Sequence, residues 1–256
     1  MEFSVLSWNI WHINQIEGKD RLHRLLGELK RLSDQYNPDC IVLCEAVQPD
    51  QNKLPPVVEH LRELGYSYHH IAPMIIMKSP DYCMSGVVIC SKFKLSDKQR
   101  HVISKNGSAA KFGYPDFDKE IISATVTLPQ GSKVKLVAAH PTATVDGMKP
   151  HRAGIKSLAQ LMHSKPFAHD TLLIGDMNQW RFFPGSLRSQ LKDLMHVRTG
   201  SFWRPTWRYN AHRFTPLRAN LDYVYWSKTS DFSLKDFKVL TSDVSDHRPL
   251  LATFKA

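Results

Sequence analysis

Residues 171–178 read TLLIGDMN, an apolar run that ends in an acid and an amide. Thr171–Gly175 has the length and the residue types of a buried strand, and its glycine marks the end of that strand. Asp176 and Asn178 therefore stand just past a strand, where a packed scaffold holds a side chain rigidly and leaves it open to a crevice. A plain turn uses the same residue types, so this stretch alone indicates only an α/β scaffold with polar groups at a strand end.

Other apolar strands along the chain also run into a carboxylate, an amide or an imidazole. These polar residues are Asn9, Glu45, His140, Asp222 and the pair Asp246-His247. Any one of them is explained by a turn. A whole series of such residues, each beside a predicted strand, indicates a site assembled at one edge of the sheets.

The remaining hydrophobic pattern predicts strands mixed with a few helices. Leucines at helical spacing predict a helix that ends near Asn37-Pro38, and further helices are expected from Pro55 to Gly65, over His151–Ser164 and over Leu187–Met195. Strands are expected at Phe3–Trp8, Cys40–Glu45, Tyr66–Ile71, Gly86–Ser91, Ile121–Leu128, Lys133–Ala139, Thr171–Gly175, Leu221–Ser227, Leu234–Leu240 and Leu250–Phe254. Two groups of strands with helices to cover them imply packed sheets with helices outside. No linker-like segment divides the chain, so residues 1–256 are expected to form a single domain.

Composition narrows the class of protein. With 42% hydrophobic and 23% charged residues, the chain has the make-up of a globular protein, and none of its apolar runs has the roughly 18–20 residues that span a bilayer. The acidic start Met1-Glu2-Phe3 does not resemble a signal peptide, so a cytoplasmic location is expected. The cysteines are too few for a disulfide framework and are expected to be buried, reduced thiols; they are Cys40, Cys44, Cys83 and Cys90.

The net charge of +10 favours an anionic partner, such as nucleic acid, a phosphorylated small molecule or an acidic lipid headgroup. A basic balance is also a common solubility feature, so charge alone does not choose among these partners or require one.

A series of short motifs carries a more specific signal. In chain order they are Ser7-Trp8-Asn9-Ile10, the strand ending at Glu45, Ser85-Gly86-Val87, Gly175-Asp176-Met177-Asn178, Leu221-Asp222-Tyr223 and Ser245-Asp246-His247-Arg248-Pro249-Leu250. In this order and spacing the chain resembles the endonuclease/exonuclease/phosphatase superfamily, from residue 4 to residue 254. The resemblance implies the DNase I-like fold, a four-layer α/β/β/α sandwich of two central mixed sheets flanked by helices, with the site at one edge.

Glu45, Asp246 and the amide oxygen of Asn9 form an all-oxygen set, which favours a hard cation such as Mg²⁺ or Mn²⁺. The resemblance implies that Glu45 is the principal metal ligand, with Asn9 and Asp246 close by. The chain has Cys44-Glu45-Ala46 where the family commonly has Gln-Glu, a change that alters a neighbour of the ligand and leaves the ligand itself.

The resemblance also implies catalytic roles. Asp176 would orient or deprotonate the attacking water, and Asn178 would hold that water or a phosphate oxygen. His247 would contact the scissile phosphate, with Asp222 pairing with its ring and favouring the imidazolium. His140 matches the other phosphate-facing histidine of the family, although the sequence Ala-His-Pro-Thr departs from the usual one after that residue.

Between Trp180 and Arg218 the chain interleaves arginines with aromatic residues. Arginines suit phosphates and aromatic rings suit stacked bases, so the residues expected to bind substrate are Trp180, Arg181, Arg204, Trp207 and Arg208. Residues 204–209 are expected to form an exposed loop. Aromatic residues buried in the core, with the arginines scattered over the surface, would produce the same composition.

The sequence therefore predicts a divalent-metal-dependent phosphodiester hydrolase that acts on DNA or RNA, as a monomer with no obligate protein partner. One alternative is a phospholipid or inositol phosphate phosphoesterase, although no long apolar hairpin suited to membrane insertion is evident. The other is an inactive phosphate-binding module, against which the full set of matched polar residues argues.

Overall fold

Two mixed six-stranded sheets dominate the computed structural model, which describes residues 2–11, 19–48, 53–76, 84–107, 117–143, 147–167, 169–180, 185–209 and 217–255. The first sheet has the order β13 (Ser233–Val239), β14 (Leu250–Lys255), β1 (Glu2–Asn9), β2 (Cys40–Gln48), β4 (Met84–Ser91) and β3 (Tyr68–Ile76). The second has the order β5 (Leu95–Gly107), β6 (Phe117–Thr127), β7 (Lys133–Ala139), β8 (Thr171–Asp176), β12 (Asp222–Ser227) and β9 (Met195–Thr199). Each sheet contains a parallel pair near its middle, β1 with β2 and β7 with β8.

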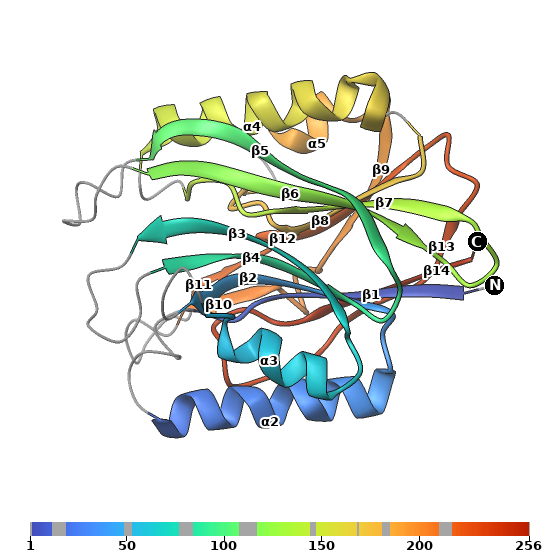
Figure 1. Ribbon diagram of the computed structural model, residues 1–256. Coiled ribbons are helices and arrows are strands. Elements are labelled where there is room, and N and C mark those ends of the chain that lie inside the picture. Colours follow the sequence, from blue (N-terminus) through green and yellow to red (C-terminus); the bar gives the residue numbers. More distant parts are fainter. Residues whose placement is uncertain are drawn as a thin grey trace.

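Helices cover the outer face of each sheet (Figure 1). The helices α2 (Lys19–Tyr36) and α3 (Pro56–Glu63) lie on the first sheet, while α4 (Met148–His163), the 3-10 turn η3 (Lys165–Phe167) and the short α5 (Leu187–Gln190) lie on the second. A third apolar cluster fills the space between the two sheets. The predicted four-layer α/β/β/α sandwich is thus confirmed, because each strand face and each helix stripe finds an apolar partner.

The two ends of the chain are joined in the first sheet. Glu2 of β1 is opposite Lys255 of β14 in an antiparallel ladder, and both termini lie at the same side of the molecule (Figure 1). Because β1 lies between β14 and β2, the Ser-Asp-His motif that precedes β14 is brought next to Asn9 at the far end of β1.

Three segments differ from the sequence expectation. The helix predicted over Leu187–Met195 ends at Gln190, and Met195 opens β9, which pairs with β12. The polar strand β5 was not predicted, because it is an edge strand that pairs with β6 and shows no hydrophobic alternation. The loop expected over residues 204–209 instead contains the strand β10 (Trp207–Tyr209), which pairs with β11 (Leu217–Ala219).

Cys40, Cys44 and Cys90 are buried and free, as predicted, while Cys83 lies outside the described residues. Burial raises the pKa of Cys40 to about 12, so this thiol stays protonated and unreactive at neutral pH. Among the helices that the structure describes, none has the length and apolarity needed to cross a membrane.

Candidate active site

The predicted polar residues converge where β1, β7 and β8 end, where β12 begins, and where β2 carries a bulge. Glu45 occupies a bulge in β2, between Cys44 and Ala46, and its backbone has a φ of 63°. A left-handed backbone is unusual for glutamate, and such strained positions cluster at functional sites. The bulge removes Glu45 from the ladder and lets its side chain reach Asn9 on the neighbouring strand.

Gly175 sets the approach of the two parallel strands β7 and β8. Its φ is 143°, and a Cβ at this position would lie 2.1 Å from the carbonyl oxygen of Ala139. Only glycine fits this close contact. The contact places Asp176 beside His140, the residue that follows Ala139.

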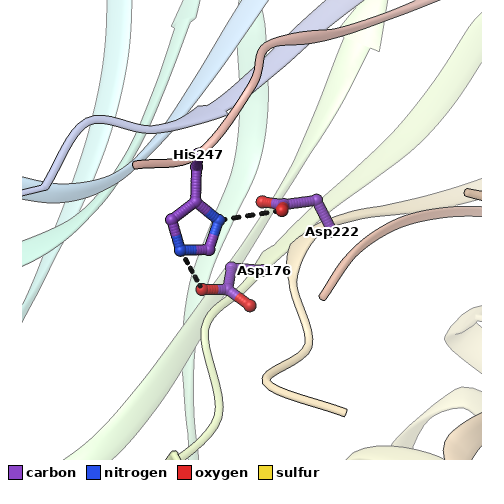
Figure 2. A group of neighbouring side chains, drawn as sticks. All are labelled: Asp176, Asp222 and His247. Atoms are coloured by element: carbon purple, nitrogen blue, oxygen red, sulfur yellow. Dashed lines mark hydrogen bonds and ion pairs between the residues drawn. The ribbon is translucent and has the colours of Figure 1, made fainter. Parts of the chain in front are cut away.

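His247 lies between two carboxylates (Figure 2). Its Nδ1 is 2.8 Å from Oδ2 of Asp222, and its Nε2 is 3.6 Å from Oδ2 of Asp176. The three side chains are buried and their ligand atoms all lie within 4.8 Å of one another, so the group has the composition of a metal site. The two ring nitrogens, however, face opposite acids, and one cation cannot bind both. The arrangement suits a doubly protonated imidazole held between two acids.

Electrostatics supports this protonation state. Burial opposes the charge on the ring, but the carboxylates of Asp222 and Asp176 outweigh it and raise the pKa of His247 to about 10. Burial also raises the pKa of Asp176, to about 7, although His247 draws it downward. The site therefore combines a cationic histidine with a carboxylate that titrates near neutral pH, which is the pKa range of an effective general base.

Asn9 links the two halves of the site. Its Nδ2 donates to Oε1 of Glu45 at 2.9 Å and to Oδ2 of Asp176 at 3.0 Å, while its Oδ1 accepts from the backbone N–H of Trp11 at 3.0 Å. In this orientation the amide contacts the acids through its nitrogen, whereas a ligand role would need its oxygen. His140 lies beside the same acids, with Nε2 3.6 Å from Asp176 and 3.8 Å from Glu45.

Asn178 contacts the carboxylate oxygen of Asp176 that Asn9 does not contact. Its backbone N–H donates to Oδ1 of Asp176 at 2.8 Å, and its side-chain Nδ2 donates to the carbonyl of Pro141 at 3.0 Å. The residue has a φ of 49°, a conformation that asparagine tolerates better than most residues. Asn178 thus connects the strand end of β8 to the chain that follows β7.

Asp246 completes the acidic set. Its Oδ2 accepts from Nε1 of Trp207 at 2.9 Å, and the neighbouring Ser245 hydroxyl donates to the backbone carbonyl of Asn9 at 2.8 Å. Burial raises the pKa of Asp246, and the negative charge of Glu45 adds to this effect. Glu45 and Asp246 are therefore close enough to repel each other.

This repulsion is the observation that tests the fit of a metal ion. Burial and the negative charge of Glu45 raise the pKa of Asp246, so these two partly buried carboxylates provide hard oxygen donors whose charge a divalent cation would neutralise. The side chains of Glu45 and Asp246 therefore fit Mg²⁺ or Mn²⁺ by their donor chemistry.

Of the residues expected to bind substrate, Trp207 and Arg208 contact Asp246 of this site. Trp180 is exposed and Arg204 is exposed, whereas Trp207 and Arg208 are half-buried. The indole N–H of Trp207 is engaged by Asp246, so this residue also holds an acid of the site. Arg181 lies outside the described residues.

Two residues that position the site were not predicted from the sequence. Thr206 Oγ1 accepts the backbone N–H groups of Leu221 and Asp222, at 2.9 and 3.1 Å. Trp8 Nε1 donates to the backbone carbonyl of His247 at 3.0 Å. The position of Trp8 beside Asn9 was a usable signal, whereas Thr206 lies in a polar stretch that has no distinguishing pattern.

Comparisons with known proteins give a consistent result. The model of the Endonuclease/Exonuclease/phosphatase family matches residues 6–247. None of the curated proteins matches the sequence significantly.

Several solved structures share the fold. An endonuclease/exonuclease/phosphatase from Beutenbergia cavernae is 18% identical with a TM-score of 0.71, over 99% of this chain and 71% of that one. The catalytic domain of human Nocturnin with a bound sulfate is 18% identical with a TM-score of 0.68, over 99% and 93%. D. rerio TDP2 complexed with a single-strand DNA product is 17% identical with a TM-score of 0.65, over 100% and 99%. At these identities the likeness shows the fold alone.

Proposed function

Since the chain belongs to the Endonuclease/Exonuclease/phosphatase family, whose members hydrolyse phosphoester bonds, we propose that it is a divalent-metal-dependent phosphodiester hydrolase acting on nucleic acid. The observation that carries the proposal is the position of His247 between Asp222 and Asp176. It pairs a cationic donor for a phosphate with a carboxylate able to accept a proton near neutral pH.

In the proposed reaction Asp176 accepts a proton from a water molecule that attacks phosphorus, and the bond from phosphorus to the leaving oxygen breaks. Asn9 and the backbone N–H of Asn178 each donate to one oxygen of Asp176 and fix its orientation. Asp222 holds the ring of His247 through Nδ1, so that the Nε2–H is available to a phosphate oxygen.

Glu45 and Asp246 would hold the divalent cation, which when bound supplies positive charge to a phosphate oxygen and to the leaving oxygen. Asn9 keeps Glu45 in place by donating a hydrogen bond to it. Trp207 does the same for Asp246 through its indole N–H, at 2.9 Å.

Nucleic acid is favoured as substrate by the surroundings of the site. Arg204, Arg208, Arg218 and Arg248 lie close enough together that the other three lower the pKa of Arg248. The exposed rings of Phe202 and Trp203 directly precede Arg204 in the chain, and Trp180 is a further exposed ring. Arginines with exposed rings suit a phosphate backbone with unpaired bases. Among the neighbours in fold, TDP2 was solved with a single-strand DNA product, and ANGEL2 is described as a 2′,3′-cyclic phosphatase.

The test is hydrolysis of single-stranded DNA, single-stranded RNA, a phospholipid and an inositol phosphate, each with Mg²⁺, with Mn²⁺ and with excess chelator. We expect a nucleic acid to be cleaved fastest, activity to vanish in chelator, and activity to return with either metal. Glu45→Gln should raise the Mg²⁺ concentration for half-maximal activity at least about tenfold, because one anionic ligand is lost. The exposed Glu59 on α3 offers the matched control, and Glu59→Gln should leave that concentration unchanged.

Full activity in excess chelator would contradict metal dependence. Faster hydrolysis of the phospholipid or the inositol phosphate would assign the site to the alternative substrate class.

A further inference from the structure

A cavity of about 540 Å³ opens beside the acidic set, on the side of Asp246 that faces α2. Its lining includes four arginines and an indole, with Asp246 forming part of the wall; these residues are Arg21, Arg24, Arg208, Arg248, Trp11 and Asp246. We call this space the arginine cavity.

The positive charge of the arginine cavity is only partly neutralised by the protein. Arg24 forms an exposed ion pair with Asp243 at 3.3 Å. By contrast, the Nε of Arg208 is buried and has no hydrogen-bond partner within the part of the chain that the structure describes. Arg208 lines the cavity, so its positive charge acts there even though this nitrogen is shielded from solvent.

Positively charged arginine side chains also lie close to one another near the cavity. Arg208 stands directly opposite Arg218 in the β10–β11 ladder, a cross-strand arrangement that is destabilising by itself. Arg208 and Arg248 both line the cavity, together with Arg21 and Arg24. An anion in the cavity would relieve this repulsion.

The cavity lies next to the active site, because Asp246 belongs to both. The N–H of Arg208 donates to the carbonyl of Asp246 at 2.9 Å, and Arg248 follows His247 directly in the chain. Trp11 is tied to the side chain of Asn9 by its own N–H. An anion in the cavity would therefore lie beside Asp246 of the active site.

We propose that the arginine cavity binds a second phosphate of the substrate, next to the phosphate that is cleaved, with Trp11 offering a ring to the adjoining base. The inference rests on the proposed function and extends it: the preferred substrate carries a phosphate on the nucleotide beside the scissile linkage. Arginine pairs with phosphate in a fork of two hydrogen bonds, and an indole stacks on a base of any sequence.

The experiment measures binding by calorimetry with Mg²⁺ present, in an Asp176→Asn background that prevents turnover. The probes are thymidine 5′-monophosphate, thymidine 3′,5′-bisphosphate and inositol 1,4-bisphosphate. The Asp176→Asn protein without further substitutions, the parent protein of this experiment, should bind the thymidine bisphosphate at least about tenfold more tightly than the monophosphate. Arg208→Gln should remove most of this advantage, Arg208→Lys should keep part of it, and the control Arg62→Gln on the exposed surface of α3 should keep all of it.

Equal affinity for the thymidine monophosphate and bisphosphate in the parent protein would overturn the proposal. Equal affinity for the thymidine and inositol bisphosphates would show a phosphate site without a nucleotide preference, and would overturn the role of Trp11. Thermal unfolding of each variant shows whether it is folded. If Arg208→Gln is unfolded, the affinities of Arg208→Lys for the two thymidine probes test the proposal instead. If no nucleic acid is cleaved but the bisphosphate advantage is present, the proposed function fails while the cavity assignment stands.

Discussion

The pKa values of Asp176 and His247 are both raised in the active site, and each shift suits the role of that group in the proposed reaction. Both side chains are buried, and burial acts against charge on each. The histidine is flanked by acids on both ring nitrogens, so its pKa rises despite its burial. The removal of its hydration raises the pKa of the Asp176 carboxylate, and this effect outweighs the attraction of His247. Asp176 therefore titrates near neutral pH, while His247 stays protonated until a higher pH.

The substitution Asp176→Asn should reduce the catalytic activity and raise the stability of the protein. The pKa of Asp176 is raised from 3.8 to about 7, so the folded protein holds this proton more tightly than the unfolded chain does. Stability is then lost as the pH rises from 3.8 through 7. In chelator at pH 8 we expect Asp176→Asn to raise the free energy of unfolding by at least about 1 kcal/mol, or roughly 2–4 °C in Tm, and to reduce kcat by orders of magnitude. Denaturation at pH 8 and pH 4 checks the sign, because the gain should shrink at the lower pH; a loss of stability at pH 8 would show the opposite linkage.

Asp222→Asn should move the alkaline limb of the pH profile toward neutral pH. Asp222 is the strongest of the groups that raise the pKa of His247 to about 10, so the variant loses the imidazolium at a lower pH. The profile of kcat/KM should rise through about 7, as Asp176 deprotonates, and fall toward about 10 in the parent protein. The stability due to the raised pKa of His247 is complete below 6.5 and disappears as the pH rises through about 10, so Asp222→Asn should also lower Tm at pH 7. An unchanged alkaline limb would show that the charge on His247 does not set the alkaline limb of activity.

At the scale of the elements, the site depends on strand ends that depart from regular geometry. The bulge at Glu45 and the close contact at Gly175 both occur where a strand delivers an acid, and the left-handed Asn178 follows immediately after β8. Regular strands would direct alternate side chains to opposite faces and could not bring all the acids to one edge. The local irregularities are therefore part of how the two sheets assemble the site.

Gly175→Ala tests the close contact between β7 and β8. A methyl group 2.1 Å from the Ala139 carbonyl must displace backbone, and the φ of 143° is unfavourable for alanine. We expect a loss of at least about 3 kcal/mol in the free energy of unfolding, measured by denaturant titration. Gly27 on α2 is the matched control: a Cβ there meets nothing within 4 Å, so Gly27→Ala should stabilise by about 0.5–1 kcal/mol. A Gly175→Ala protein as stable as the parent would mean that the strands separate without cost.

At the scale of the whole molecule, charge and fold act together. The chain carries a net charge of +10, and several of its arginines gather around the edge where the two sheets deliver the acids. The positive charge of these arginines attracts a polyanion, even though the residues at the centre of the site are acidic. The arginines would thus serve binding, while the acids serve the chemistry.

Replacing Arg204 and Arg208 together by Gln should weaken the affinity for single-stranded nucleic acid at every sequence alike. It should also make the slope of log affinity against log salt shallower by roughly 1–2, since each phosphate contact contributes about 0.7–0.9. Titration between low and moderate salt measures the slope, with Arg62→Gln as the control and Tm measured alongside. An unchanged slope in a stable double variant would favour the phospholipid or inositol phosphate alternative.

Most of the strands, the acids that accompany them and the order of the motifs can be read from the sequence without the structure. Runs such as Leu172–Gly175 are identified by local length and apolarity, and Asp176, Asn178 and His247 belong to short motifs that need no long-range information. The two-sheet architecture follows from these strands because their apolar faces must be covered.

The tertiary structure alone decided which groups meet. Trp8 and His247 are 239 positions apart, and the arginine cavity joins residues of α2 to residues near β10 and β14. No local pattern records such pairs, because contacts between distant segments depend on how the sheets and helices pack. The edge strand β5 and the short strand β10 were missed for the same reason: each is a strand because a partner strand pairs with it, and pairing outweighs weak local propensity.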